Sequence, residues 1–164
     1  MEKEAEYSRL VEGPPLDPYH GGARPALLMV DDVDEAAKVK EAVVELGYRP
    51  VPAGNSIQGI GWMRFHEFGL VVLFDPYDGV SLERSPVLHY LNGLSMSIRR
   101  RIFLALIGER FRTADGIMAL AMSANLVVSP QDVDRFAGTL KLAVSDNERF
   151  YRGFLDAIRE SGKA

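Results

Sequence analysis

Two apolar runs in this chain each end at carboxylate side chains, and residues of these types in this pattern could support chemistry. The run 26–30 ends at the adjacent acids Asp31 and Asp32, and the run 70–74 ends at Asp75. Because parallel strands bring their carboxyl ends to one edge of a sheet, we expect the three carboxylates to gather there. A few carboxylates and water molecules are the ligands that Mg²⁺ prefers. Asp31, Asp32 and Asp75 therefore form a candidate magnesium site.

The segments that must position these acids alternate between strand-like and helix-like patterns. Strands are expected over 26–30, 49–53, 70–74, 102–107 and 126–128, and helices over 34–46, 56–68, 85–100, 113–123 and from 129 onward. Continuous apolar runs are typical of parallel strands that are buried on both faces. The fold class expected is α/β, a doubly wound five-stranded parallel sheet in a flavodoxin-like three-layer sandwich with an extended C-terminal helix.

Composition excludes several classes of protein. The chain has 164 residues, a net charge of −4 and no cysteine, so disulfides, cysteine-based metal sites and a thiol nucleophile are excluded. A net negative charge argues against nucleic-acid binding, and no apolar run is long enough to span a membrane. The charged N-terminus has no signal-peptide pattern, so we expect a cytoplasmic protein with no membrane partner.

The two ends of the chain differ from its centre. Residues 1–25 are rich in glycine and proline and are expected to be a flexible segment ahead of a domain over 26–144. The last helical pattern holds one apolar face for about 28 residues, or about 42 Å, which is longer than such a domain is thick. Either it breaks near Ser145–Asn147, or residues 145–164 form an extension that leaves the domain.

That extension carries apolar side chains that point to a partner. An exposed apolar patch usually marks an interface, so a homodimer through these residues is expected. The residues are Phe150, Tyr151, Phe154, Leu155 and Ile158. A separate cluster, Arg99-Arg100-Arg101, is interpreted as a solvated helix end.

Four pieces of the sequence, in this order, resemble the receiver domain of bacterial response regulators. Leu27–Asp32 is similar to the first strand and acidic pair of that family, and Leu46–Asn55 to its second strand and the turn that follows. Leu70–Asp75 ends where the family has its phospho-accepting aspartate, and Val127–Pro130 resembles the end of its fifth strand. The resemblance covers about residues 26–142.

The resemblance implies a role in two-component signalling and phosphorelay. Asp31 and Asp32 would be ligands of Mg²⁺, and Asp75 would be both ligand and nucleophile toward a phosphohistidine. The backbone carbonyl near Tyr77 would be a further ligand. A histidine kinase or another signalling protein would be the partner.

Three positions depart from the family. By the resemblance, the strand-four Thr or Ser that contacts the phosphoryl group falls on Ile107, and the lysine before the strand-five proline falls on Ser129. The strand-five switch aromatic falls on Leu126. Isoleucine cannot donate a hydrogen bond and serine carries no charge. A two-state switch needs contacts that differ between its states, so these losses predict a pseudo-receiver.

The sequence leaves three alternative functions to compare. The first is a receiver-like signalling and protein-interaction module, not an enzyme, whose phosphoacceptor machinery is degenerate. The second is a divergent response regulator that is phosphorylated on Asp75 with Mg²⁺. The third, a magnesium-dependent phosphohydrolase, is disfavoured because Tyr77 stands where such enzymes have a second aspartate.

Overall fold

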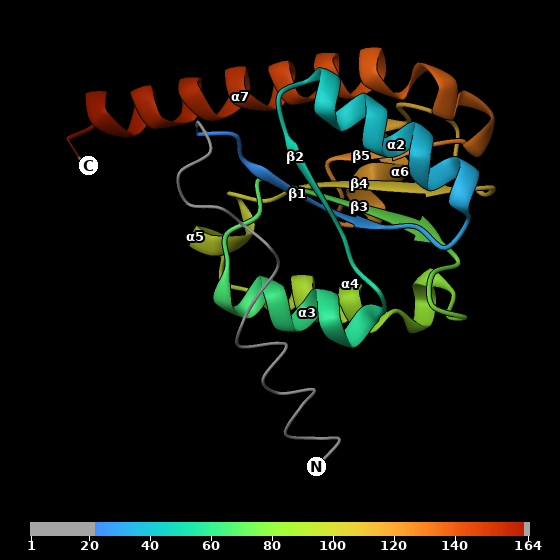
Figure 1. The fold of residues 1–164 in the computed structure, drawn as a ribbon. Helices are drawn as coiled ribbons and strands as arrows, with labels where there is room; N and C mark the ends of the chain where they lie inside the picture. The colour runs from blue at the N-terminus through green and yellow to red at the C-terminus, as the bar shows by residue number, and fades with distance from the viewer. Residues whose placement is uncertain (1–21, 163–164) are drawn as a thin grey trace.

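A parallel sheet of five strands lies between two layers of helices in the computed structural model, which describes residues 22–162 (Figure 1). The strands are β1 (Pro25–Met29), β2 (Arg49–Pro52), β3 (Leu70–Asp75), β4 (Phe103–Gly108) and β5 (Leu126–Val128). Their order across the sheet is β2-β1-β3-β4-β5, and every pairing is parallel. The predicted fold class is confirmed.

The apolar runs form the central strands because both of their faces are covered. Alternate residues of β1 point to opposite layers, with Leu27 in one core cluster and Leu28 in the other. The central strands β3 and β4 are buried almost throughout. β2 lies at an edge of the sheet, as the prolines at 50 and 52 predicted.

The helices divide between the two faces of the sheet. They are α2 (Val33–Glu45), α3 (Ser56–Phe65), α4 (Pro86–Asn92), α5 (Met96–Arg99), α6 (Gly116–Ala121) and α7 (Phe136–Glu160). Two short 3₁₀ helices, η1 (Leu82–Arg84) and η2 (Pro130–Arg135), precede α4 and α7. Helices α2 and α7 pack on one face, and α3 and α4 on the other (Figure 1). Ala119 of α6 belongs to the same core cluster as α3 and α4.

One predicted helix is two helices in the structure. The segment 85–100, expected as a single helix, ends its first part at Asn92, and α5 begins at Met96. Gly93 caps the end of α4, where its N–H donates to the carbonyl of His89. A glycine is a poor residue to continue a helix, which explains the break.

Helix α7 runs without interruption through Ser145–Asn147, so the chain does not break there. Its two fully covered residues, Phe136 and Leu140, both lie in its first turns. The second half extends past the sheet (Figure 1). The alternative of a break is therefore wrong, and the division into a domain over 26–144 and an extension over 145–164 stays a prediction.

One prediction about the N-terminus is not tested by the structure. The prediction of a flexible segment over 1–25 falls largely on residues 1–21, which lie outside the described residues. Within residues 22–162, no helix combines the length and apolar composition needed to cross a bilayer.

Candidate functional site

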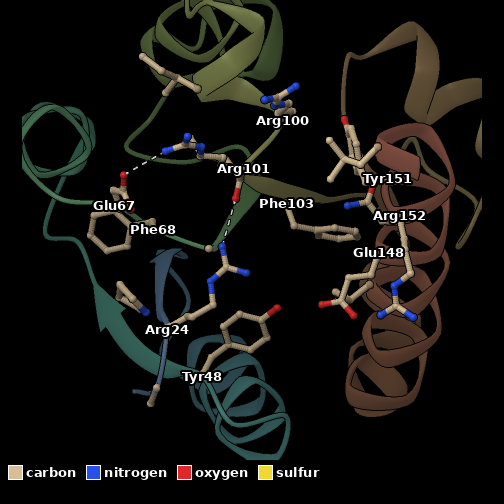
Figure 2. Close-up of a pocket in the computed structure, with 18 of the residues that line it drawn as sticks. Arg24, Tyr48, Glu67, Phe68, Arg100, Arg101, Phe103, Glu148, Tyr151 and Arg152 are labelled. Atoms are coloured by element: carbon tan, nitrogen blue, oxygen red, sulfur yellow. Dashed lines mark hydrogen bonds and ion pairs between the residues drawn. The ribbon is translucent and has the colours of Figure 1, made fainter. Parts of the chain in front are cut away.

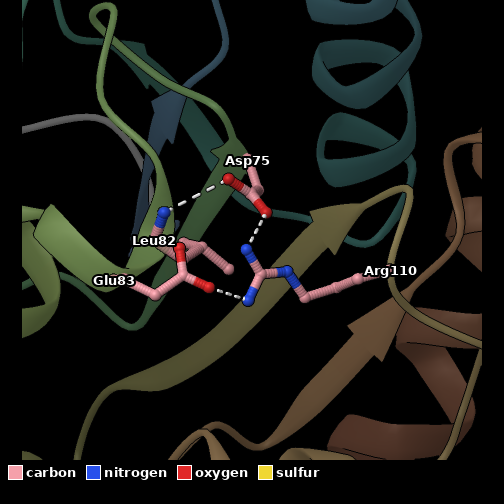
Figure 3. A network of polar contacts seen from close by, with 4 residues as sticks. All are labelled: Asp75, Leu82, Glu83 and Arg110. Atoms are coloured by element: carbon pink, nitrogen blue, oxygen red, sulfur yellow. Dashed lines mark hydrogen bonds and ion pairs between the residues drawn. The ribbon is translucent and has the colours of Figure 1, made fainter.

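Asp75 ends β3 at the carboxyl edge of the sheet, and both of its carboxylate oxygens are engaged (Figure 3). Oδ1 accepts a hydrogen bond from the backbone N–H of Leu82 at 3.2 Å. Oδ2 lies 3.0 Å from a guanidinium nitrogen of Arg110. The side chain of Asp75 is 11% exposed and that of Arg110 is 36% exposed. The candidate phosphoacceptor is thus mostly buried and already paired with a cation.

Arg110 lies in the loop that follows β4 and bridges two acids. Besides Asp75, its guanidinium donates a hydrogen bond to Glu83 of η1 (Figure 3). The hydrogen bond to Arg110 is the main reason that the pKa of Glu83 falls to about 2. The same bond is the main reason that the pKa of Arg110 is raised. The three side chains form a network that joins β3, η1 and the loop after β4.

Sequence reasoning missed Arg110. The resemblance placed the family's lysine, the cation of its site, at Ser129 directly after β5. No other residue was considered for the role of cation. A signal was present, however, because Glu109 and Arg110 directly follow a buried strand. A parallel strand delivers the residues after it to the same edge as Asp75.

Asp31 and Asp32 lie at this edge too, but each has a local structural partner. Asp32 is the N-cap of α2, and its Oδ1 accepts a hydrogen bond from the N–H of Glu35 at 2.9 Å. Oδ2 of Asp31 accepts one from the N–H of Asp78 at 2.8 Å. An N-cap acid satisfies a backbone donor at the start of a helix. These contacts direct the two carboxylates toward α2 and toward the loop after β3.

The arrangement of these acids does not fit a metal ion as it stands. Among residues 22–162, no three His, Cys, Asp or Glu side chains form a group that could hold one. The carbonyl of Tyr77, a ligand implied by the resemblance, accepts a hydrogen bond from the N–H of Val80 at 3.0 Å. Magnesium at Asp31, Asp32 and Asp75 stays a prediction, and it would require the ion pair between Asp75 and Arg110 to open.

The loop after β3 is held from several sides. The side chain of Asp78 accepts a hydrogen bond from the N–H of Ser56, at the start of α3, at 3.0 Å. The hydroxyl of Tyr77 donates to the carbonyl of Ala53 at 3.1 Å. Burial, and then the nearby charges of Asp31 and Asp78, raise the pKa of Tyr77. The loop is thus tied to β1, β2 and α3.

The strand-four residue beside Asp75 is Gly108, and the correspondence of Ile107 with the family's Thr or Ser stays a prediction. In the sheet register Asp75 is opposite Gly108, while Ile107 is opposite Phe74. Ile107 is fully buried in the core under α2 and α7. A Cβ atom on Gly108 would lie 3.0 Å from the Cβ of Asp75 and 3.3 Å from the ring of Phe111. The close packing at this point explains the glycine.

The two strand-five positions have structural roles. The N–H of Ser129 donates to Oγ1 of Thr113 at 2.9 Å, and its hydroxyl accepts from the N–H of Gln131 at 3.4 Å. Ser129 therefore caps the start of η2. Leu126 is buried in the core cluster under α2 and α7. Neither side chain supplies a charge to the edge of the sheet.

No family model matches this sequence, and no curated protein matches it. Solved structures do match its shape. NtrX from Brucella abortus in complex with ADP aligns over 87% of this chain and 30% of that chain, with a TM-score of 0.60 and 16% identity. The chain thus spans 30% of the length of NtrX.

Two separate receiver domains match over nearly their whole length. The signal receiver domain of a histidine kinase from Syntrophus aciditrophicus aligns over 76% of this chain and 92% of that chain, with a TM-score of 0.58 and 18% identity. The CheY-like response regulator receiver domain protein from Methanospirillum hungatei aligns over 78% and 98%, with a TM-score of 0.56 and 14% identity. At these identities the likeness shows the fold. The chain has the fold of response-regulator receiver domains, and the resemblance is confirmed at that level.

Proposed function

We propose that this chain is a receiver-like signalling module that acts by binding a protein partner and whose phosphoacceptor machinery is degenerate. The proposal rests on the contacts of the Asp75 carboxylate. One of its oxygens is paired with Arg110 and the other accepts a backbone hydrogen bond. A carboxylate that is paired with a cation is a weaker nucleophile, so the ion pair opposes phosphorylation.

The residues around Asp75 also give little help to phosphoryl transfer. Such a reaction depends on cations and donors placed where charge develops. Arg110 shares its charge between Asp75 and Glu83. Neither Ile107 nor Gly108 has a hydroxyl, and Ser129 has no charge, so none of them can replace the threonine and lysine of the family. A phosphoryl group on Asp75 would have few contacts to couple it to a distant surface.

The surface that supports a binding role is the second half of α7. Phe150, Phe154 and Leu155 are 69%, 46% and 43% exposed. Tyr151 and Ile158 are half-buried on the same stretch of helix. Contiguous exposed apolar side chains favour an interface. We propose that these residues form a homodimer contact or receive a signalling protein such as a histidine kinase.

A divergent phospho-accepting regulator is the second candidate. The place of Asp75 favours it, because this acid ends a central strand at the edge where Asp31 and Asp32 also lie. In this case Arg110 would leave Asp75 for the incoming phosphoryl group, and Mg²⁺ would bind the three acids. The two candidates differ in whether assembly responds to a phosphodonor.

Sedimentation of the full chain tests the proposal. We expect a dimer whose proportion does not change when Mg²⁺ and acetyl phosphate are added. Phe150→Ser with Phe154→Ser should give a monomer. Ile117→Ser with Leu120→Ser is the matched control, because these α6 residues are 84% and 81% exposed. A dimer that forms only with the phosphodonor would support the second candidate, and a monomer in all conditions would contradict the homodimer contact.

A further inference from the structure

A cavity of about 1050 Å³ lies beneath the overhanging half of α7, at the edge of the sheet opposite Asp75 (Figure 2). Its walls include residues that precede strands, such as Arg24 before β1, Tyr48 before β2 and Ile102 before β4. Glu148, Tyr151 and Arg152 of α7 form the opposite wall. Because strands in a parallel sheet share one direction, this is the amino edge. The cavity is separate from the site of Asp75.

The lining of the cavity is positively charged, although the chain as a whole carries −4. Five arginines face three acids around it. The arginines are Arg24, Arg100, Arg101, Arg152 and Arg159, and the acids are Glu67, Glu148 and Asp156. A concave surface of one sign concentrates ligands of the opposite sign.

Three of these arginines have no partner among residues 22–162. Arg101 pairs with Glu67 at 3.5 Å, and Arg24 donates to the carbonyl of Arg101 at 3.4 Å (Figure 2). Within the part of the chain that the structure describes, however, the guanidinium groups of three make no hydrogen bond or ion pair. These are Arg100, Arg152 and Arg159, and all three are exposed.

The neighbouring Arg99, by contrast, has a structural role, because its guanidinium is bonded to the backbone. Its guanidinium donates to the carbonyl of Ile102 at 2.7 Å and to that of Ser123 at 2.8 Å. Burial lowers its pKa. The interpretation of Arg99-Arg100-Arg101 as a solvated helix end was therefore wrong for Arg99. Arg100 and Arg101 are exposed and line the cavity.

Aromatic side chains lie between the arginines. Phe68 and Phe103 are buried at the base of the cavity, and Tyr48 and Tyr151 are half-buried on its walls (Figure 2). Arginine pairs well with carboxylates in bidentate geometry, and aromatic walls receive apolar side chains. A ligand that fits both the arginines and the aromatic walls has carboxylates on either side of an aromatic or aliphatic group.

We propose that this cavity binds an acidic peptide segment of a partner protein, with an aromatic or aliphatic side chain between its carboxylates. The inference rests on the proposed function, because it names the chemistry of the partner of a binding module. Phe150 and Phe154 do not line the cavity, whereas Tyr151 and Leu155 do, so the proposed homodimer contact and this site adjoin on α7 and share these two residues. The net charge of −4 opposes nucleic acid as the occupant.

Selection of peptides from a random library against the full chain tests the proposal. We expect the selected peptides to be enriched in Asp and Glu around a Phe, Tyr, Trp or Leu. Labelled copies should bind the variant Arg100→Glu with Arg152→Glu at least about tenfold more weakly than the parent. Arg112→Glu with Arg135→Glu is the matched control, because both arginines are exposed and lie outside the cavity. The control should bind like the parent, and circular dichroism should show both variants folded.

Three results would overturn the proposal. Neutral or basic selected peptides, or equal binding to the cavity variant and the control, would show that the arginines recognise no acidic segment. Residues 1–21 contain five acids and two Lys or Arg residues and join the chain at Gly22, which lines the cavity. If peptides bound only after Glu4→Gln, Glu6→Gln and Glu12→Gln, the occupant would be the chain's own segment and not a partner protein, which would also overturn the proposal. Sedimentation of the parent measures the homodimer separately, so each of the three results leaves the proposed homodimer contact standing.

Discussion

The guanidinium of Arg110 lies 3.0 Å from the carboxylate of Asp75, the acid that the resemblance makes the phosphoacceptor. The contact joins the end of β3 to the loop after β4. It balances the charge of an acid that is mostly buried, and it links that acid to Glu83. The ion pair is therefore both a structural contact and the reason to expect an unreactive Asp75.

Replacing Arg110 should destabilise the fold. Arg110→Ala leaves the carboxylate of Asp75 without its cation, and because Arg110 is 36% exposed we expect a loss of about 1 kcal/mol in the free energy of unfolding. Urea unfolding measures this loss. The matched control is Arg112→Ala, an exposed arginine for which little change is expected. Equal losses in the two variants would show that the pair with Asp75 contributes nothing.

The stability of the chain should depend on pH through Glu83. Its pKa is lowered from 4.5 to about 2, so its contribution is present above pH 4.5 and is lost as the pH falls toward about 2. The melting temperature of Glu83→Gln should lie below that of the parent at neutral pH, and the difference should shrink over that acidic range. Glu45→Gln, at an exposed acid of α2, is the control. A difference that is constant with pH would contradict this assignment.

Asp32 offers a way to separate helix capping from metal binding. Asp32→Ala removes the N-cap of α2 and should cost about 1 kcal/mol of unfolding free energy. Asp32→Asn keeps the capping oxygen and should cost much less. Calorimetry with and without Mg²⁺ measures both effects. Stabilisation of the parent by Mg²⁺ that disappears in Asp32→Asn would show that this carboxylate binds the metal instead.

Gly108 should tolerate no side chain. Gly108→Ala places a Cβ at 3.0 Å from the Cβ of Asp75, and overpacking of this kind costs about 1–3 kcal/mol. Gly138→Ala is the matched control, because nothing lies within 4 Å of the added Cβ in α7. That substitution should stabilise the helix by about 0.5–1 kcal/mol. Chemical denaturation of the two variants should therefore give changes of opposite sign.

Most of the sheet could be predicted because its strands are apolar on both faces. The runs 26–30 and 70–74 have no other stable place than the centre of a parallel sheet, and the acids that follow them must reach one edge. The helix over 85–100 was harder, because its apolar spacing continues past Gly93 while the backbone does not. Gly93 was the local signal for this break, and the apolar spacing on both sides of it concealed that signal.

The contacts of the candidate site could not be predicted in the same way. Ile107 and Gly108 are adjacent, and only the register of β3 with β4 decides which one faces Asp75. The direction of Arg110 depends on how its loop turns after β4. Both depend on pairing between distant segments, which single-sequence patterns do not report.

The most direct test of the account is the intact mass of the chain after incubation with Mg²⁺ and acetyl phosphate, beside Asp75→Asn. We predict no phosphoryl adduct on either protein, with circular dichroism showing both to be folded. Arg110→Gln should be measured in parallel, since it frees an oxygen of Asp75 but restores neither the family's threonine nor its lysine. A phosphoryl adduct on the parent that is absent from Asp75→Asn would contradict the account and make this chain a working phosphoacceptor.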